Sequence, residues 1–94
     1  MDWDKLRIFH AVSEAGSFTH AGRRLHLSQS SISRQISTLE ENLGVPLFHR
    51  HARGLKLTEQ GETLYRTSKD VANKIITAES LVAESMERPR GPLR

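Results

Sequence analysis

The sequence predicts a mainly α-helical fold, in which three short helices and a small β-hairpin precede one long C-terminal helix. Three observations predict it. Apolar residues recur at steps of three and four along most of the 94 residues, which is the period of an α-helix. Asp, Ser or Thr precedes each of these patterns, as residues that cap helix N-termini do. Residues 46–57 break the pattern, with two short apolar runs around a turn that contains glycine.

Composition limits the class of protein. With 36% hydrophobic and 27% charged residues, the chain is typical of one small globular domain. No apolar run approaches the roughly 20 residues that a membrane-spanning helix needs, and the acidic N-terminus lacks the apolar stretch of a signal peptide. The absence of cysteine excludes disulfides and thiolate metal ligands within the chain. We therefore expect a cytoplasmic protein.

The net charge of +3 is unevenly distributed along the chain. Residues 1–19 carry a net charge of −1, residues 20–58 carry +4, residues 59–87 carry −3 and the last seven residues carry +3. The basic middle of the chain therefore forms a patch between acidic segments. A basic patch of this kind favours a polyanion as the partner.

The first two helices follow directly from their end residues. Asp2 or Asp4 is expected to cap a first helix that stops at Gly16, and Ser17 to cap a short second helix that ends near position 25. Within the second helix, Gly22 leaves room for another backbone segment to approach closely. The predicted apolar face of the first helix consists of Leu6, Phe9, Val12 and Ser13, with Ile8 and Ala11 beside them.

The third helix has a sharply divided surface. Ser28 is its expected N-cap and Gly44 its C-terminal left-handed residue. The predicted buried stripe, at steps of four, three and four, consists of Ile32, Ile36, Leu39 and Leu43. The outward-facing residues, which gather in the first turns, are Gln29, Ser30, Ser33, Arg34 and Ser37.

Two short helices joined by a tight turn match the helix-turn-helix, in which the N-terminal residues of the second helix reach base edges in the major groove. A glutamine amide can pair in bidentate fashion with adenine, an arginine can bind guanine or phosphate, and serine can donate to either. Each residue type alone is common on a solvated surface. Together, in this two-helix arrangement, they predict that residues 28–43 form a DNA recognition helix.

Residues 47–57 are predicted to form a hairpin wing, with strands at 47–50 and 55–57, which completes a winged helix-turn-helix. Arg50 and Arg53 lie on either side of the turn, where they can reach a minor groove or phosphates. Arg50 could instead pair with the carboxylates that precede the hairpin, at positions 40 and 41. Arg53 is therefore the better candidate for a DNA contact.

Thr58 is expected to cap a last helix that runs to Glu87, with apolar and small residues at alternating steps of four and three. A helix of this length would extend about 43 Å, which is too long to be buried along one small domain. We therefore expect homodimerisation through its outer half. We expect Trp3 and Tyr65 to pack between the first and last helices rather than to serve as stacking platforms for bases. The candidate dimer residues are Trp3, Leu64, Val71, Ile75, Ala78 and Val82.

Other kinds of site find little support. Among the five histidines, His49 and His51 come closest to a pair of metal ligands. Because strand residues alternate between two faces, and no His or carboxylate follows either one at four residues, we expect no metal site. The chain also lacks a nucleophile motif, paired carboxylates and a glycine-rich phosphate loop. We predict no catalytic residue and no cofactor in this fragment.

The stretch from Ser17 to Leu64 resembles the N-terminal winged helix-turn-helix of LysR-type transcriptional regulators, and residues 2–10 and 48–62 resemble most closely its LsrB/VtlR-like branch. Two positions depart from the family pattern, because Gly22 stands where alanine is usual and Ser30 where many members have proline. The matching motifs are Ser17-Phe18-Thr19, Leu25 to Ser33, Leu39 to Gly44, Leu47-Phe48-x-Arg50, Arg53-Gly54-Leu55 and Leu57-Thr58-x-x-Gly61.

The resemblance implies a bacterial cytoplasmic regulator, associated with the nucleoid at promoters, that binds double-stranded promoter DNA as a homodimer. It implies a DNA-binding domain at 1–58, a dimerising linker helix at 59–87 and a hinge at 88–94 to an absent effector-binding domain. It also implies that the full-length protein can assemble into tetramers and that a small-molecule or redox effector would bind the absent domain. The DNA-binding residues are expected to be Ser17, Thr19, Ser28, Gln29, Ser30, Ser31, Ser33, Arg34, Arg50 and Arg53.

A different class of function is a protein-interaction module. In that interpretation the long helix is the functional surface, and the basic patch binds an acidic protein instead of DNA. Sequence-specific binding to DNA would distinguish a DNA-binding regulator from this protein-interaction module.

Overall fold

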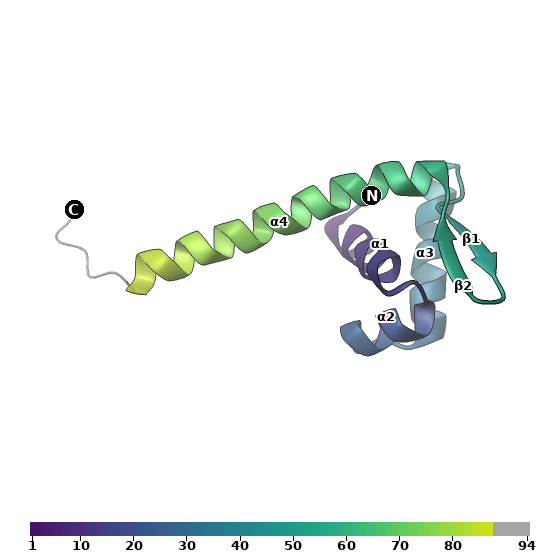
Figure 1. Cartoon of the computed structure of the whole chain (residues 1–94), viewed down its shortest axis with the longest axis horizontal. Coiled ribbons are helices and arrows are strands. Elements are labelled where there is room, and N and C mark those ends of the chain that lie inside the picture. The colour runs from purple at the N-terminus through teal and green to yellow at the C-terminus, as the bar shows by residue number, and fades with distance from the viewer. Residues whose placement is uncertain (88–94) are drawn as a thin grey trace.

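The computed structural model describes residues 1–87, and the predicted hinge at 88–94 lies outside the described residues. Three helices and a hairpin form a compact body, and the last helix lies across this body and extends well beyond it (Figure 1). The predicted mainly α-helical winged helix-turn-helix with a long C-terminal helix is confirmed. The elements are α1 (Trp3–Ala15), α2 (Phe18–Leu25), α3 (Gln29–Leu43), β1 (Phe48–His51), β2 (Gly54–Leu57) and α4 (Glu59–Glu87).

Capping side chains fix the helix starts where the sequence predicts them. Asp2, and not Asp4, caps α1, because its carboxylate accepts a hydrogen bond from the backbone amide three residues on. The hydroxyl oxygens of Ser17 and Ser28 cap α2 and α3 in the same way. The first and third helices each end at a glycine with positive φ, as predicted.

The turn between α2 and α3 is tight at Gly22. A Cβ atom at this position would lie 2.5 Å from the carbonyl oxygen of Leu27, whose amide in turn donates to the Gly22 carbonyl oxygen (2.9 Å). The predicted close approach of another backbone is confirmed, and it offsets the helix propensity that glycine lacks. His26 ends α2 with a φ of 59°, a left-handed conformation that the sequence pattern did not predict.

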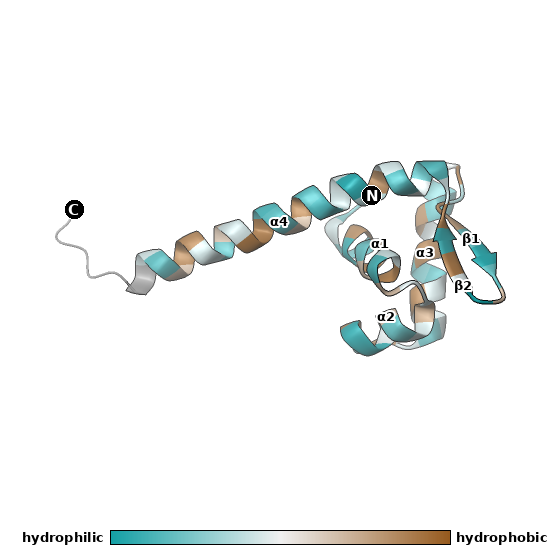
Figure 2. Cartoon of the chain, viewed as in Figure 1, coloured by the Kyte–Doolittle hydropathy of each residue, from teal (hydrophilic) through white to brown (hydrophobic). Residues whose placement is uncertain are grey.

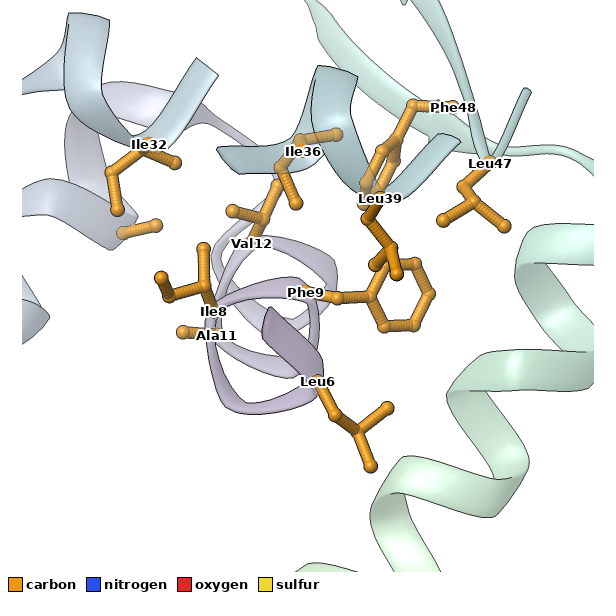
Figure 3. Close-up of a cluster of buried hydrophobic side chains, with 11 residues drawn as sticks. Leu6, Ile8, Phe9, Ala11, Val12, Ile32, Ile36, Leu39, Leu47 and Phe48 are labelled. Atoms are coloured by element: carbon orange, nitrogen blue, oxygen red, sulfur yellow. The ribbon is translucent and has the colours of Figure 1, made fainter. Parts of the chain in front are cut away.

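The hydrophobic core lies where α1 crosses α3 and the start of the hairpin (Figure 3). Phe9 of α1 is fully buried, and its ring packs against the ring of Phe48 at a centroid distance of 5.4 Å. Ile32, Ile36 and Leu39 of α3 are also almost completely buried. Leu43, predicted to complete their stripe, is 42% exposed, because it is the last residue of α3, next to the Gly44 cap, and the buried stripe ends at Leu39.

The wing is an antiparallel hairpin in which β1 pairs with β2 from Phe48 opposite Leu57 to His51 opposite Gly54. The strands are therefore one residue nearer the turn than predicted, and the turn itself is only Ala52 and Arg53. Gly54 has a φ of 134°, which suits glycine at this exit from the turn.

The start of α4 is bound to the segment that leads into β1. The Thr58 hydroxyl accepts from the Gly61 amide (2.9 Å) and donates to the Pro46 carbonyl oxygen (2.8 Å), so the predicted Thr58 cap is confirmed. Gly61 packs directly against the Leu47 carbonyl oxygen, where any Cβ atom would clash. The first turn of α4 is thus held in a fixed place beside the hairpin.

The predicted heptad seam of α4 is divided between two environments. Leu64 and Val71, expected at the dimer contact, lie half-buried against the core of their own chain. In contrast, Ile75, Ala78 and Val82 are exposed, with fractional exposures of 36% at Ile75 and 61% at Val82. These three residues, hereafter the outer seam, lie where α4 has left the body, and Figure 2 shows hydrophobic bands along that part of the helix.

Trp3 and Tyr65 differ in environment, although the sequence suggested the same packing role for both. Tyr65 lies half-buried between α1 and α4, as predicted. Trp3 is 41% exposed, so its assignment as a packing residue is wrong. In the described part of the chain, no helix is long and apolar enough to cross a membrane.

Candidate nucleic-acid interface

The first turns of α3 present polar side chains to solvent. Gln29, Ser30 and Arg34 are exposed, and Ser31 and Ser33 are half-buried beside them. The buried face of α3 lies against α1, so this polar surface points away from the core. The structure therefore brings the predicted recognition residues together on one accessible surface.

Helix α2 orients the glutamine of that surface. The Thr19 hydroxyl donates a hydrogen bond to the side-chain carbonyl oxygen of Gln29 (3.2 Å). That oxygen has a second lone pair, and the amide nitrogen has two protons free to donate. Gln29 can therefore still make the bidentate pair that reads adenine, with its amide plane held by Thr19.

Two of the predicted contact residues already have structural roles. The hydroxyl oxygens of Ser17 and Ser28 accept the capping hydrogen bonds of α2 and α3. Ser28 also lies within hydrogen-bond distance of the Ser30 hydroxyl (3.4 Å). Because a serine hydroxyl both accepts and donates, Ser17 can still donate its proton to a phosphate while it caps the helix.

The wing is bound to the rest of the body at the turn between α1 and α2 and at the end of α3. The backbone amide of Leu55 in β2 donates to the carbonyl oxygen of Gly16 (3.2 Å). At the base of the wing, the Glu40 carboxylate of α3 accepts from the backbone amides of Leu47 (2.7 Å) and Phe48 (3.3 Å). These hydrogen bonds hold the base of the wing against α3 and against the corner between α1 and α2.

Arg50 and Arg53 have different surroundings in the wing. The Arg50 guanidinium lies over the Phe18 ring, 5.1 Å from its centroid, and so ties the wing to α2 by a cation–π contact. The alternative pairing of Arg50 with Glu40 or Glu41 is wrong, since no such ion pair occurs within residues 1–87. Glu40 is instead bound to backbone amides. Arg53 is exposed at the tip of the hairpin.

The hairpin tip and the N-terminal end of α3 lie on the same side of the body, away from α4 (Figure 1). This side carries Arg34 and Arg53, and neither has a carboxylate within ion-pair distance in the part of the chain that the structure describes. Unpaired arginines on one side give that side a positive potential, which suits the phosphates of a nucleic acid.

The outer face of the wing adds positive and titratable groups that sequence reasoning missed. His49 and His51 are exposed on the same face of β1, with ring centroids 6.4 Å apart, so the expectation that they point to opposite faces is wrong. Two residues apart on a strand, they share a face, and Lys56 lies opposite His49 on β2. The period of the strand was the signal that could have found this set.

No group of three or more His, Cys, Asp or Glu side chains suited to a metal ion occurs among the described residues. The exposed groups at the start of α3 and on the wing are hydrogen-bond donors, hydrogen-bond acceptors and positively charged side chains.

Comparison with known proteins identifies the family. Residues 3–62 match the family described as bacterial regulatory helix-turn-helix protein, lysR family. HTH-type transcriptional regulator YofA of Bacillus subtilis is 40% identical over 94 residues, which is all of this chain and 33% of that protein. HTH-type transcriptional regulator MetR of Haemophilus influenzae is 37% identical over 94 residues, which is all of this chain and 30% of that protein. The chain thus spans about a third of the length of these relatives.

Solved structures of the same family have the same architecture. The crystal structure of a BenM_DBD/catB site 1 DNA complex matches with a TM-score of 0.82 and 34% identity, over 94% of this chain and 99% of that chain. The crystal structure of a CbnR_DBD–DNA complex matches with a TM-score of 0.76 and 34% identity, over 94% of this chain and all of that chain. From its motifs, its fold and these matches, the chain belongs to the LysR family of bacterial helix-turn-helix regulators.

Proposed function

We propose that this chain binds double-stranded promoter DNA sequence-specifically as a homodimer, in the role of the DNA-binding part of a LysR-type transcriptional regulator. In the proposed complex α3 enters the major groove, and the wing reaches the adjacent minor groove or backbone. The residues proposed to contact or organise the DNA interface are Ser17, Thr19, Ser28, Gln29, Ser30, Ser31, Ser33, Arg34, Arg50 and Arg53.

The observation that carries this proposal is the fixed position of the wing relative to the exposed start of α3. Gln29 and Arg53 lie on rigid elements that are joined through the Leu55 and Glu40 hydrogen bonds. Rigid placement lets two neighbouring grooves be read at once without ordering a loop on binding. The BenM_DBD and CbnR_DBD complexes support the proposal, because each is a DNA complex of a chain with this fold.

Within this proposal the residues have three kinds of role. Gln29 reads a base edge, Arg34 binds guanine or phosphate, and Arg53 contacts the minor groove or phosphates from the wing tip. Thr19 positions Gln29. Arg50, lying over Phe18, acts mainly by holding the wing in place.

The outer seam supports the proposed dimer. Ile75, Ala78 and Val82 form an exposed apolar strip on a helix that extends past the body. A second copy of the same helix, running antiparallel, would bury this strip and place two recognition helices on one duplex. Trp3, the exposed first residue of α1, is proposed to take part in the same contact.

We extend the proposal to the bacterial cytoplasm as the compartment, with the protein associated with the nucleoid at promoters. No cofactor is proposed for DNA binding. The relatives are about three times as long as this chain. In a longer protein of this family, we propose that a further domain senses a small-molecule or redox effector and that tetramers form.

Selection of bound sequences from a random pool of DNA duplexes tests the proposed function. We expect an enriched site with two-fold symmetry, whose half-site centres lie about 34 to 36 Å apart or at multiples of that distance. Equal affinity for the selected duplex and for an unrelated duplex at physiological salt would overturn specific binding. Capture of an acidic protein without any DNA preference would favour the protein-interaction module instead.

A further inference from the structure

Four polar side chains form a closed set of contacts where α1 meets α4. His10 and Glu14 lie one turn apart on α1, and Tyr65 and Ser68 lie one turn apart on α4. His10 Nδ1 is 2.8 Å from the Ser68 hydroxyl, and the Tyr65 hydroxyl donates to the Glu14 carboxylate at 2.5 Å. The His10 and Tyr65 rings stack with centroids 5.6 Å apart and planes 13° from parallel. We call these four residues the latch.

The hydrogen bonds of the latch have a defined direction. The Ser68 hydroxyl, which is almost completely buried, donates its single proton to the Tyr65 backbone carbonyl oxygen (2.9 Å). Its oxygen is then an acceptor for His10, so the neutral imidazole that satisfies both bonds carries its proton on Nδ1. The other ring nitrogen, Nε2, lies 4.0 Å from the Glu14 carboxylate, which is beyond hydrogen-bond distance. The hydrogen-bond partner of Glu14 in the latch is the Tyr65 hydroxyl.

The hydrogen bond between Tyr65 and Glu14 shifts the pKa of both residues. The hydrogen bond from the Tyr65 hydroxyl lowers the pKa of Glu14 below its ordinary value. The same bond raises the pKa of Tyr65. Both shifts favour the same state, a tyrosine that donates to a carboxylate.

The latch lies close to the point where α4 is fixed to the body, so a small shift of the helix at the latch becomes a larger shift at its outer end. The first turn of α4 is fixed beside the wing at Thr58 and Gly61, and Ser68 lies about 10 Å further along the helix axis. The outer seam extends to Val82, which is about 30 Å from Gly61 along the same axis. A lateral shift of α4 at the latch is therefore amplified roughly threefold at Val82.

Apolar packing alone does not fix the direction of the α4 axis relative to α1. Leu64 and Val71 pack against the core on either side of the latch, but apolar contacts are not directional. Hydrogen bonds have preferred distances and angles, so the bonds at Ser68 and Tyr65 restrict how α4 crosses α1. In a dimer joined through the outer seam, that crossing sets the separation of the two recognition helices.

We propose that the latch is a specificity-determining element, which fixes the direction of α4 relative to α3 and thereby selects the spacing between the two half-sites of an operator. The latch residues touch no DNA and act as positioning residues. The proposal rests on the proposed dimeric DNA-binding function. It predicts that breaking the latch relaxes the preferred spacing without changing the bases that are read.

A series of DNA duplexes that differ only in the spacing between the two half-sites tests this proposal. The site selected from the random pool is rebuilt with its half-sites moved by one and two base pairs, and affinities are measured for the wild-type chain, Tyr65→Phe and Ser68→Ala. Ser80→Ala, an exposed serine on the same helix, is the matched control. We expect the ratio of affinities between best and shifted spacings to fall about three- to tenfold in the latch variants, as the loss of one or two hydrogen bonds allows.

A merely stabilising contact would lower the melting temperature and the affinity at every spacing alike. An unchanged spacing ratio in folded Tyr65→Phe, which keeps the ring that stacks on His10, would overturn the proposal. Affinity for a duplex with a single half-site should stay at the wild-type value, because the recognition surface is untouched.

A distance measurement tests the latch without DNA. Since the chain has no cysteine, Asn42→Cys on α3 and Thr77→Cys on α4 allow two spin labels at exposed sites. Labelled chain diluted in unlabelled chain reports the distance within one protomer. We expect a narrow distribution that broadens with Tyr65→Phe or Ser68→Ala. Equal widths would overturn the latch even if the chain binds no specific site, whereas a broadened distribution without specific DNA binding would count against the proposed function alone.

Discussion

Thr19 holds the side-chain amide of Gln29 in place, with a hydrogen bond of 3.2 Å from its hydroxyl, near the start of α2, to the first residue of α3. The bond joins the two helices of the helix-turn-helix through the side chain proposed to read a base. In the proposed complex Gln29 contacts a base, and Thr19 holds the Gln29 side chain in position for that contact.

Gln29→Ala should remove discrimination at one base pair of each half-site. We expect a loss of about 1 to 3 kcal/mol of preference there, with preferences at other positions unchanged. Thr19→Val should reduce the preference at the same position by less, because the amide remains but is no longer held. A panel of duplexes with single substitutions measures both. Asn42→Ala, an exposed amide at the far end of α3, is the control. A uniform loss across the panel would show that Gln29 contacts the backbone only.

Arg53→Ala should change the salt dependence of binding more than its specificity. Loss of one phosphate contact at the wing tip lowers the slope of log affinity against log salt by about 1. Titrations between low and physiological salt give the slope. Arg66→Ala, which removes an exposed charge from α4, should leave the slope at the wild-type value. If both variants change the slope equally, the wing tip makes no contact of its own.

Ile75→Asp should weaken the dimer by placing a carboxylate within the outer seam. Sedimentation analysis at micromolar concentrations should show a shift toward monomer and a loss of affinity for the two-half-site duplex. Ile76→Asp is the matched control, because Ile76 is also exposed on α4 but turns about 100° away from Ile75. A wild-type chain that is already a monomer, together with unchanged DNA affinity in Ile75→Asp, would contradict the seam.

Gly61→Ala should destabilise the fold, because the added Cβ atom meets the Leu47 carbonyl oxygen and the backbone must move. We expect a loss of about 1 to 3 kcal/mol in the free energy of unfolding, which exceeds the helix propensity gained from alanine. Thermal or denaturant unfolding measures it. Gln60→Ala, at the exposed neighbouring position, should change stability little. A more stable Gly61→Ala chain would mean that α4 and the wing are not held together there.

Tyr65→Phe should make stability less dependent on pH at both ends of the range. Glu14, with a lowered pKa, contributes stability above its ordinary value of 4.5 that is lost as the pH falls through the lowered value. Tyr65, with a raised pKa, contributes stability below its ordinary value of 10.0 that is lost as the pH rises through the raised value. The difference in melting temperature between wild type and variant should therefore be largest between these limits. In Tyr65→Phe, NMR titration should show the pKa of Glu14 nearer its ordinary value.

Local sequence was enough to predict the helices, because caps such as Ser17 and Ser28 and apolar steps of three and four are local signals. It was also enough to place the exposed polar residues at the start of α3. Contacts between segments that are distant in the sequence could not be predicted in the same way. The cation–π contact of Arg50 with Phe18 and the bonds of Glu40 to the wing depend on how far the hairpin folds back, which no local pattern gives.

The seam of α4 shows the same limit on one helix. A continuous pattern predicted one partner for Leu64 through Val82. The structure divides it, because the core of the same chain already covers part of Leu64 and Val71, and the part beyond the body is left exposed. Periodicity identifies the face that is buried but does not identify which chain buries it. The latch was missed for a related reason, since His10 and Ser68 are 58 positions apart.

The last tertiary anchor of the wing is the bond from Leu55 to Gly16, and Ala52 and Arg53 project beyond it as a free end. Loop residues past an anchor can be lengthened at small cost in conformational entropy. In the proposed complex, insertions at this tip would therefore change how far the wing extends along the DNA, while α3 would keep its place in the major groove. The length of DNA contacted could in this way vary among related proteins independently of the bases that α3 contacts.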